Sequence, residues 1–456
     1  MKYHIYIIVV VLYSLTGLSC KKFIESTSVK NQITASDVYA DDATALSAVT
    51  GIYIALAPST SFAGGGPQSV TAMAGLSADE FNDLSNSLAM QEFLFNALSP
   101  TNSILLTNLW GNSYQCIFYC NSIIEGLENS TKITPGLKTQ LEAEAKFIRA
   151  FSYFYLVNLF GDVPLATGTD YRVNAALART PVQDVYKQIV ADLQVAQQSL
   201  AGDFVFAGNN RVRATKWAAT ALLARAYLYL GEWEKAEAES SAVISQSGLF
   251  SLLTDLNSVF LKNSQEAIWQ LPAPGIINTN EAKTFQSLSF VSLSNTLFNS
   301  FEAGDSRKIS WTNSKTANST AYQLPFKYKI AIDGQPITES SVVLRMAEQY
   351  LIRSEARAHL NKITESKEDL DKIRLRANLP ASTATTQEEV LSAIEQERRI
   401  ELFSEWGHRW FDLKRTNRAS SVLGAVKQNW SATDQLYPIP QTERSKNSNL
   451  SQNSGY

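Results

Sequence analysis

Cysteine and histidine are scarce, with only three of each among 456 residues. Three cysteines cannot build a disulfide framework, because Cys20 ends the only apolar targeting segment of the chain. Cys116 and Cys120 stand four residues apart in a segment with helical spacing, so both thiols would share one helix face. We interpret them as two small buried hydrophobic side chains. A metal site would need further cysteine or histidine ligands nearby, so we expect no metal and no cofactor.

Strong charge of either sign is also missing. The formal net charge is -3, and lysine and arginine are spread along the chain without a long basic run. A nucleic-acid partner is therefore excluded on electrostatic grounds. Hydrophobic residues make up 45% of the chain and charged residues 18%, which is typical of a folded globular protein and not of a disordered one.

Motifs for nucleotide binding and for covalent catalysis are absent as well. The glycine-rich stretch 64–67 ends in proline and is not followed by the Lys-Ser/Thr pair of a phosphate-binding loop. No G-x-S-x-G elbow occurs, and neither Cys116 nor Cys120 has the local signature of a nucleophile. These local motifs therefore indicate neither nucleotide binding nor covalent catalysis.

Long hydrophobic runs are confined to the amino end. Lys2 precedes an apolar stretch over residues 5–12, which suits a signal peptide over residues 1–19 better than a membrane span. Ser19 and Cys20 resemble the end of a bacterial lipobox, although Gly17 stands where leucine is usual. We expect lipidation at Cys20, a tether over residues 20–35, and firm membrane attachment through the acyl chains.

The rest of the chain is dominated by amphipathic helical spacing, which predicts a mainly α fold. Helices are expected over 110–128, 137–159, 182–200, 215–230, 233–245, 347–361 and 366–377, after a first helix that starts at Ser36-Asp37. The junction at 227–236 looks like the turn of a tetratricopeptide repeat, and the pattern recurs irregularly near 347–377. We infer a helical-repeat scaffold over about 36–57, 104–248 and 342–416.

Between the scaffold portions, residues 250–341 change in character. This stretch is rich in serine, asparagine, threonine and glycine and has few long helical patterns. It is too long for an ordinary connection, and loops carried on a rigid scaffold often hold binding sites. We therefore expect a variable, loop-rich half that binds the ligand.

Four segments resemble the SusD/RagB family, and they occur in the family's order. They are EAEAKFIRAFSYFYLVNLFGDVPL (142–165), ALLARAYL (221–228), LRMAEQYLIRSEA (344–356), and ERRIEL (397–402) with GHRWFDLKR (407–415) and LYPIP (436–440). The closing QNSGY (452–456) is also similar to the family's tail. The resemblance implies that residues 36–456 form one SusD-like domain.

The resemblance further implies a binding function at the outer membrane, without enzymatic activity. Family members are lipid-anchored at the cell surface and act as hinged lids on a SusC-like TonB-dependent transporter, to which they deliver captured polysaccharide or oligosaccharide. The RagB branch handles peptides, so a peptide ligand is an alternative. A helical-repeat adaptor for another protein and a hydrolase hidden in the variable half are further alternatives.

One charged motif could suggest acid-base catalysis, but its spacing favours structure. Its residues alternate in sign at separations of three and four, which would pair them along one helix and with its neighbours. They are Glu397, Arg398, Arg399, Glu401, Glu405, Arg409, Asp412 and Arg415. We expect the same structural role for Asp305 with Arg307, and a packed or capping role for His408.

Candidate ligand contacts come from two places. Trp311 and Tyr322 lie in the loop-rich half among amides and hydroxyls, as a sugar platform requires. Phe81, Asn82 and Asp83 end a segment that resembles the part of the family leading to its ligand-facing surface. We predict that these five residues contact the ligand, with core packing as the competing interpretation for the aromatics and helix capping for the neighbouring Asp79.

Overall fold

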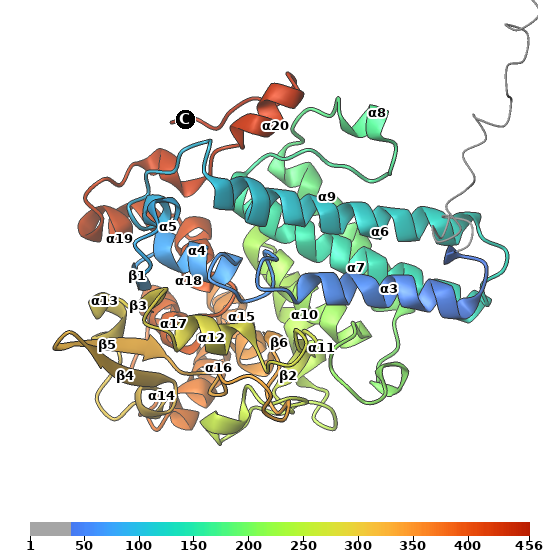
Figure 1. The fold of residues 1–456 in the computed structure, drawn as a ribbon. Helices are drawn as coiled ribbons and strands as arrows, with labels where there is room; N and C mark the ends of the chain where they lie inside the picture. The colour runs from blue at the N-terminus through green and yellow to red at the C-terminus, as the bar shows by residue number, and fades with distance from the viewer. Residues whose placement is uncertain (1–37) are drawn as a thin grey trace, which may run out of the picture.

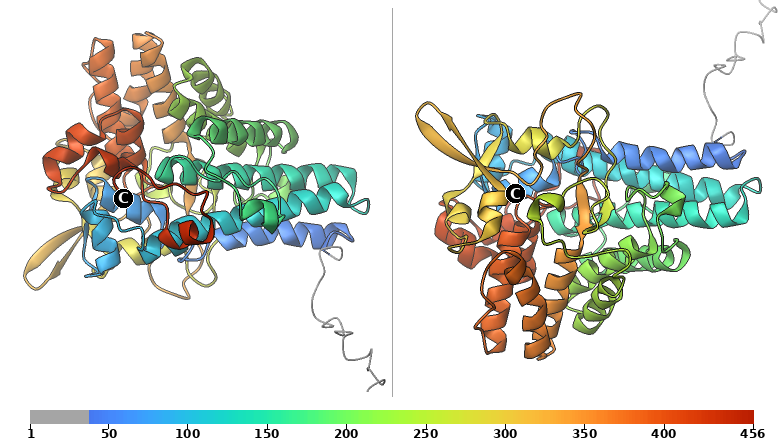
Figure 2. Two further views of the ribbon diagram at one scale, coloured as in Figure 1. Left: turned by 90° about the horizontal axis from the view of Figure 1, so that it is seen from above. Right: turned by 90° about the horizontal axis from the view of Figure 1, so that it is seen from below.

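The computed structural model describes residues 38–456, and the predictions for the signal peptide, for Cys20 and for the tether lie outside this range. The fold is mainly α, as predicted, with six short strands among the described residues. Two long antiparallel helices, α6 and α7, run beside α3, and the carboxyl-terminal helices stand across them (Figures 1 and 2).

The amino-terminal and central helices include a stack that follows chain order through α6, α7, α9, α10 and α11. Their bounds are α3 (Asp42–Leu56), α4 (Val70–Ser77), α5 (Leu88–Leu94), η2 (Leu105–Gly111), α6 (Asn112–Asn129), α7 (Pro135–Phe160), α8 (Tyr171–Asn174), α9 (Val182–Ser199), η3 (Val205–Ala207), α10 (Lys216–Leu230) and α11 (Trp233–Ile244). Helix α7 packs against both α6 and α9, and α10 packs against α9 and α11. The predicted helix start at Ser36-Asp37 lies outside the described residues. Helix α3 begins at Asp42, because the Asp41 carboxylate accepts the Thr44 N–H at 2.8 Å and caps the helix.

The remaining elements are shorter. They are η4 (Leu256–Ser258), α12 (Asn280–Phe285), α13 (Asn295–Phe298), α14 (Ser306–Ser310), α15 (Met346–His359), α16 (Ile363–Arg376), α17 (Gln387–Glu401), α18 (His408–Arg415), α19 (Ala419–Val426), η5 (Ala432–Gln435) and α20 (Gln441–Lys446), with strands β1 (Phe81–Asp83), β2 (Ala267–Gln270), β3 (Val291–Leu293), β4 (Thr312–Ala317), β5 (Thr320–Pro325) and β6 (Val342–Arg345). Helix α15 packs against α11 on one side and α16 on the other, which joins the two scaffold portions into one stack.

Local sequence explains where the repeat helices start and stop. The Thr215 hydroxyl accepts the Ala218 N–H and caps α10, and Gly231 ends the helix at φ 72°, a conformation that glycine adopts without a Cβ penalty. Helix α7 starts with Pro135 at its first position and ends at Gly161, also at positive φ. These signals produce the predicted helix-turn-helix units.

Every strand pair of the described residues is antiparallel, and two of the three pairs join distant parts of the chain. Strand β1 pairs with β3, which places residues 81–83 beside 291–293, and β2 pairs with β6. Strands β4 and β5 form a hairpin that projects from the body (Figures 1 and 2). Asn318 and Ser319 turn the hairpin at φ 49° and 63°.

A cluster of buried ion pairs connects the loop-rich half to the scaffold. Arg307 binds Asp305 at 2.8 Å and Glu397 at 2.5 Å, and Arg345 binds Glu401 at 2.6 Å. The predicted Asp305–Arg307 pair is therefore confirmed. The predicted structural role of the charged motif is also confirmed, because its residues pair with neighbouring elements in the core. The motif spans two helices and not one, since α17 ends at Glu401 and α18 begins at His408.

Candidate ligand-binding cleft

Trp311 is a core residue. Its side chain is fully buried, its indole N–H donates to the Leu256 carbonyl at 3.0 Å, and its ring packs edge-on against Phe260. A ring without exposed surface cannot stack on a sugar. The prediction that Trp311 contacts the ligand is therefore wrong, because this aromatic anchors the base of the β4–β5 hairpin in the core.

Tyr322 lies on the hairpin and is half-buried. It stands opposite Lys315 in the antiparallel register, and no hydrogen bond to its hydroxyl is formed within residues 38–456. Its contact with a ligand stays a prediction.

The segment 81–83 divides between core and surface. Phe81 is buried, with its ring 5.5 Å from that of Phe285 and over Gly75, where any Cβ would lie 2.4 Å from the ring. The prediction of a ligand contact is therefore wrong for Phe81. Asn82 is exposed and donates to the Leu293 carbonyl at 3.2 Å, while the half-buried Asp83 carboxylate accepts from the Ser85 N–H and hydroxyl.

Asn82 opens onto a cleft of about 470 Å³, a volume that suits a small ligand. The cleft lies between β1, the end of α5, the start of α13 and the loop after α19. Its lining residues are Ala78, Asp79, Phe81, Asn82, Leu94, Phe95, Ser294, Asn295, Thr296, Val426, Lys427, Gln428 and Asn429. Four distant parts of the sequence therefore meet at one surface.

An exposed aromatic side chain forms part of the cleft wall. Phe95 follows the last residue of α5 and is 51% exposed, although phenylalanine is usually buried. Val426, at the end of α19, is 50% exposed in the same cleft. These two side chains offer apolar surface that the fold itself does not cover.

Three side-chain amides of the cleft have no hydrogen-bond partner among the described residues. Asn295, Gln428 and Asn429 are exposed, and none forms a side-chain hydrogen bond to any residue between 38 and 456. Each amide offers both donors and an acceptor. The cleft therefore combines an apolar wall with unused hydrogen-bonding groups.

The floor of the cleft is fixed by an ion triad. The Asp79 carboxylate binds the Arg409 guanidinium at 2.8 Å and that of Arg399 at 2.7 Å. Burial alone would raise the pKa of Asp79, but the hydrogen bonds and charges of Arg409 and Arg399 lower it. Asp79 also accepts the Ser294 and Thr296 hydroxyls at its main-chain oxygen, at 2.6 and 3.1 Å, which fixes the start of α13.

Comparison with known proteins identifies the family. A family model described as "Starch-binding associating with outer membrane" matches residues 23–228, and the model of the SusD family matches residues 296–456. The chain belongs to the SusD family. The predicted family membership and fold are thereby confirmed.

Similar proteins agree with this assignment. SusD-like protein P2 of Formosa agariphila is 28% identical over 424 residues, which cover 77% of this chain and 81% of that protein. Among solved structures, a SusD superfamily protein from Bacteroides vulgatus superposes with a TM-score of 0.81 at 20% identity, covering 91% of this chain and 99% of its own. A laminarin-binding SusD-like protein gives 0.77 at 24% identity, with 92% and 100% covered.

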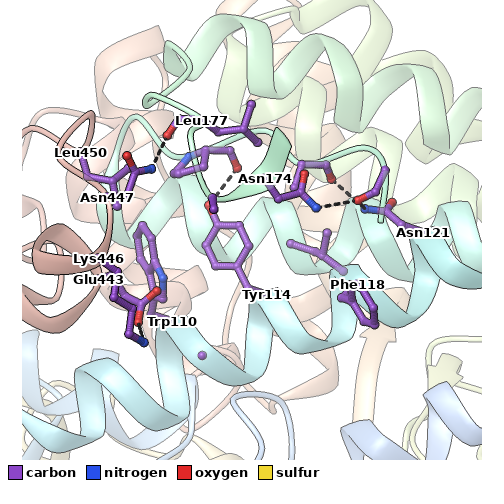
Figure 3. A pocket seen from close by; sticks show the side chains of 16 residues that line it. Trp110, Tyr114, Phe118, Asn121, Asn174, Leu177, Glu443, Lys446, Asn447 and Leu450 are labelled. Carbon is purple, nitrogen blue, oxygen red and sulfur yellow. Dashed lines mark hydrogen bonds and ion pairs between the residues drawn. The ribbon is translucent and has the colours of Figure 1, made fainter. Parts of the chain in front are cut away.

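A second hollow of this SusD-family chain, of about 440 Å³, lies along α6 beside the carboxyl-terminal helix α20 (Figure 3). Its three amides already serve the fold. Asn121 donates to the Ala166 carbonyl at 2.9 Å, Asn174 to that of Gly168 at 2.9 Å, and Asn447 to that of Leu177 at 2.8 Å. This hollow therefore offers fewer free polar groups than the cleft does.

Two other kinds of site are not found in the described part of this SusD-family chain. No group of three or more histidine, cysteine, aspartate or glutamate side chains within residues 38–456 could hold a metal ion. Within the same range, every helix is too short or too polar to cross a bilayer. Cys116 and Cys120 are buried and do not form a disulfide bond with each other. The prediction that they are two small core residues is therefore confirmed.

Proposed function

We propose that this protein captures a glycan in the cleft around Phe95 and delivers it to a SusC-like TonB-dependent transporter in the outer membrane. The observation that carries the proposal is the combination of one exposed aromatic face with three unpaired amides, those of Asn295, Gln428 and Asn429. A sugar ring needs both, because its C–H face stacks on an aromatic ring while its hydroxyls pair with fixed polar groups.

Several properties of the cleft support a sugar ligand. Phenylalanine has only two rotatable side-chain bonds, so little conformational entropy is lost when Phe95 is covered. The ion triad at Asp79 holds the surrounding backbone in place before the ligand arrives, which lowers the cost of binding. The laminarin-binding SusD-like protein with the same fold binds a glycan, and this supports the same ligand class here.

The ligand is bound without cleavage in this proposal. The carboxylate of the cleft floor, Asp79, is held by two arginines, and a carboxylate with a lowered pKa is a poor general acid. Capture followed by transfer to the transporter requires reversible binding only.

Binding of the mature protein to a panel of oligosaccharides, measured by calorimetry, tests the proposal. At least one glycan should bind, and Phe95→Ala should weaken it about tenfold, or about 1.4 kcal/mol, because the stacking face is lost. Phe118→Ala is the matched control, since Phe118 is 47% exposed but lies in the hollow along α6. It should leave the affinity unchanged.

Other results would favour other functions. Binding of unmodified peptides with no response to any sugar would favour a RagB-like peptide carrier. Release of reducing ends by extensively purified protein would favour a hydrolase. If neither a sugar nor a peptide binds, the remaining function is that of an adaptor for another protein.

Surface attachment is a separate part of the proposal. We expect Cys20 to carry the acyl chains that anchor the protein to the outer membrane. Cys20→Ala should abolish incorporation of labelled fatty acid and release the protein from the membrane fraction, and a variant that stays acylated would contradict the assignment. Co-purification of the wild-type protein with a SusC-like transporter tests the partner.

A further inference from the structure

Lys427 is a half-buried cation of the cleft that forms no ion pair with any residue between 38 and 456. It follows α19, and its ammonium group donates to the Leu94 carbonyl at 2.8 Å and to that of Leu76. Within residues 38–456, no carboxylate lies within ion-pair distance of it. Burial lowers the pKa of Lys427 to about 7, because an ammonium group is destabilised where water is excluded.

The fold explains this lysine only in part. Leu94 ends α5, and Leu76 lies in the last turn of α4. Carbonyl groups in the last turn of a helix have no partner within that helix, and the helix dipole favours a positive charge beside them. An ammonium group has three N–H donors, and these two carbonyls use two of them. Within the part of the chain that the structure describes, the third donor has no hydrogen-bond partner and the ammonium group forms no ion pair.

The other charges around the cleft compensate Lys427 only in part, because the charge of Asp79 raises the pKa of this lysine by less than burial lowers it. Asp79 is already bound to two arginines, and Glu395 pairs with Arg409 at 3.4 Å and with Arg418 at 3.6 Å. Glu80, beyond Asp79, is fully buried and accepts the Ser404 N–H, and burial raises its pKa to about 7. The groups facing the cleft from α17, α18 and the loop after α4 therefore leave an excess of positive charge.

We propose that the cleft selects glycans that carry an anionic group, a uronate carboxylate or a sulfate ester, and that Lys427 binds this group. The inference rests on the proposed glycan-binding function and names the class of glycan. An anion at the cleft would accept the third N–H of Lys427 and form the ion pair that it lacks within residues 38–456. Hydrogen bonds between an ammonium and a carboxylate or sulfate are about twice as strong as neutral ones.

Proton uptake is a direct consequence. A bound anion favours the charged ammonium, so the complex holds the proton more tightly than the free protein does. An anionic glycan should therefore bind with uptake of a proton near pH 8, and its affinity should fall as the pH rises from 6.5 to 8.5. A neutral glycan should show neither effect at Lys427.

Calorimetry with the mature protein separates these cases. The probes are oligogalacturonate, a sulfated carrageenan oligosaccharide and neutral laminarihexaose, each titrated at pH 6.5 and 8.5 in two buffers of different ionisation enthalpy. We expect at least one anionic probe to bind at least tenfold more tightly than the neutral one at pH 6.5. Whether the uronate or the sulfate binds identifies the anionic group.

Three variants at Lys427 and elsewhere refine the test. Lys427→Gln keeps N–H donors for the two carbonyls but removes the charge, and it should lose the preference for anions. Lys427→Arg keeps the charge at all pH values and should retain the preference without the pH dependence. Lys446→Gln, at an exposed lysine of the other hollow, should behave as the wild type does.

The outcomes distinguish this inference from the proposed function. Equal binding of neutral and anionic probes, or a preference that survives in Lys427→Gln, would overturn the inference and leave glycan binding intact. Failure of every probe and of the wider panel would overturn glycan binding itself. Glu80→Gln tests the other titrating group, and loss of proton uptake in that variant alone would assign the effect to Glu80 and overturn the role of Lys427. Where Lys427→Gln does not fold, Lys427→Arg decides the matter, because proton uptake that is lost in this variant belongs to Lys427 and proton uptake that persists overturns its role.

Discussion

The buried ion cluster and the cleft use polar groups in opposite ways. In the cluster, Glu401 binds Arg345 at 2.6 Å and Arg307 at 2.9 Å and also pairs with Arg376, so the charges are matched. In the cleft, Lys427 forms no ion pair and Asn295 has no side-chain partner within residues 38–456. Matched groups hold this molecule together, and unmatched groups mark the surface that we expect to meet a ligand.

Breaking the matched cluster should have the largest effect. Glu401→Ala would leave three buried arginines short of negative charge, which should lower the free energy of unfolding by about 3–5 kcal/mol. Denaturant titration of wild type and variant measures the difference. Glu388→Ala, on the exposed face of the same helix, should change it by less than about 1 kcal/mol, and similar losses in both variants would contradict the role of the cluster.

Substitutions of the core residue Trp311 and of the cleft residue Phe95 should have opposite effects on stability and on binding. Trp311→Ala removes a fully buried ring and should cost about 3 kcal/mol of stability, while the folded fraction keeps its affinity for the glycan. Phe95→Ala should show the reverse, with little loss of stability and weaker binding. A drop in affinity for Trp311→Ala at temperatures where it is folded would return Trp311 to the ligand site.

Glu281 should show how an unmatched charge in the core responds to pH. Burial raises the pKa of its carboxyl to about 7, and one of its oxygens has no partner. Because its pKa is raised in the folded protein, Glu281 contributes stability that is present below the ordinary carboxyl pKa and is lost as the pH rises through 7. Between pH 5 and 8 the wild type should therefore lose about 2 kcal/mol relative to Glu281→Gln, which stays neutral.

Glu401 behaves in the opposite sense, which provides the comparison for that experiment. Burial alone would raise the pKa of Glu401, but the charges of Arg376, Arg345 and Arg307 lower it well below the ordinary range. The contribution of Glu401 to the stability of the fold is present above the ordinary carboxyl pKa and is lost only as the pH falls. A constant stability difference between wild type and Glu281→Gln from pH 5 to 8 would contradict the assignment for Glu281.

The smallest effects are expected at the unpaired amides. Asn295→Ala or Gln428→Ala should weaken glycan binding by about 1 kcal/mol, the net worth of one hydrogen bond, without a change in melting temperature. Asn447→Ala is the matched control, because its amide donates to Leu177 and serves the fold. It should reduce stability and not affinity, and the opposite result would remove the distinction between matched and unmatched amides.

The scaffold could be predicted from the sequence because each helix carries its own signals. Pro135 and Gly161 bound α7 almost where the apolar spacing places it, and Thr215 and Gly231 do the same for α10. Such signals are local, so the sequence contains them without knowledge of tertiary contacts. The family motifs then set the order of the helices.

The ligand site was predicted less well, because exposure depends on contacts between distant segments. The composition around Trp311 and Phe81 suits a sugar platform, yet both rings are covered by the core. Phe95 was missed because nothing beside it in the sequence shows that its ring is uncovered. The run Lys427-Gln428-Asn429-Trp430, with two amides between a cation and an aromatic residue, is the signal that could have indicated the cleft.

The projecting hairpin has a consequence for how relatives of this protein can diverge. Its tip, at Asn318 and Ser319, touches solvent, while its base is held by Trp311. Because side chains alternate between faces, adding residues in pairs to both strands would preserve which face each existing side chain occupies. Evolution can therefore lengthen this arm and extend its reach without repacking the interior.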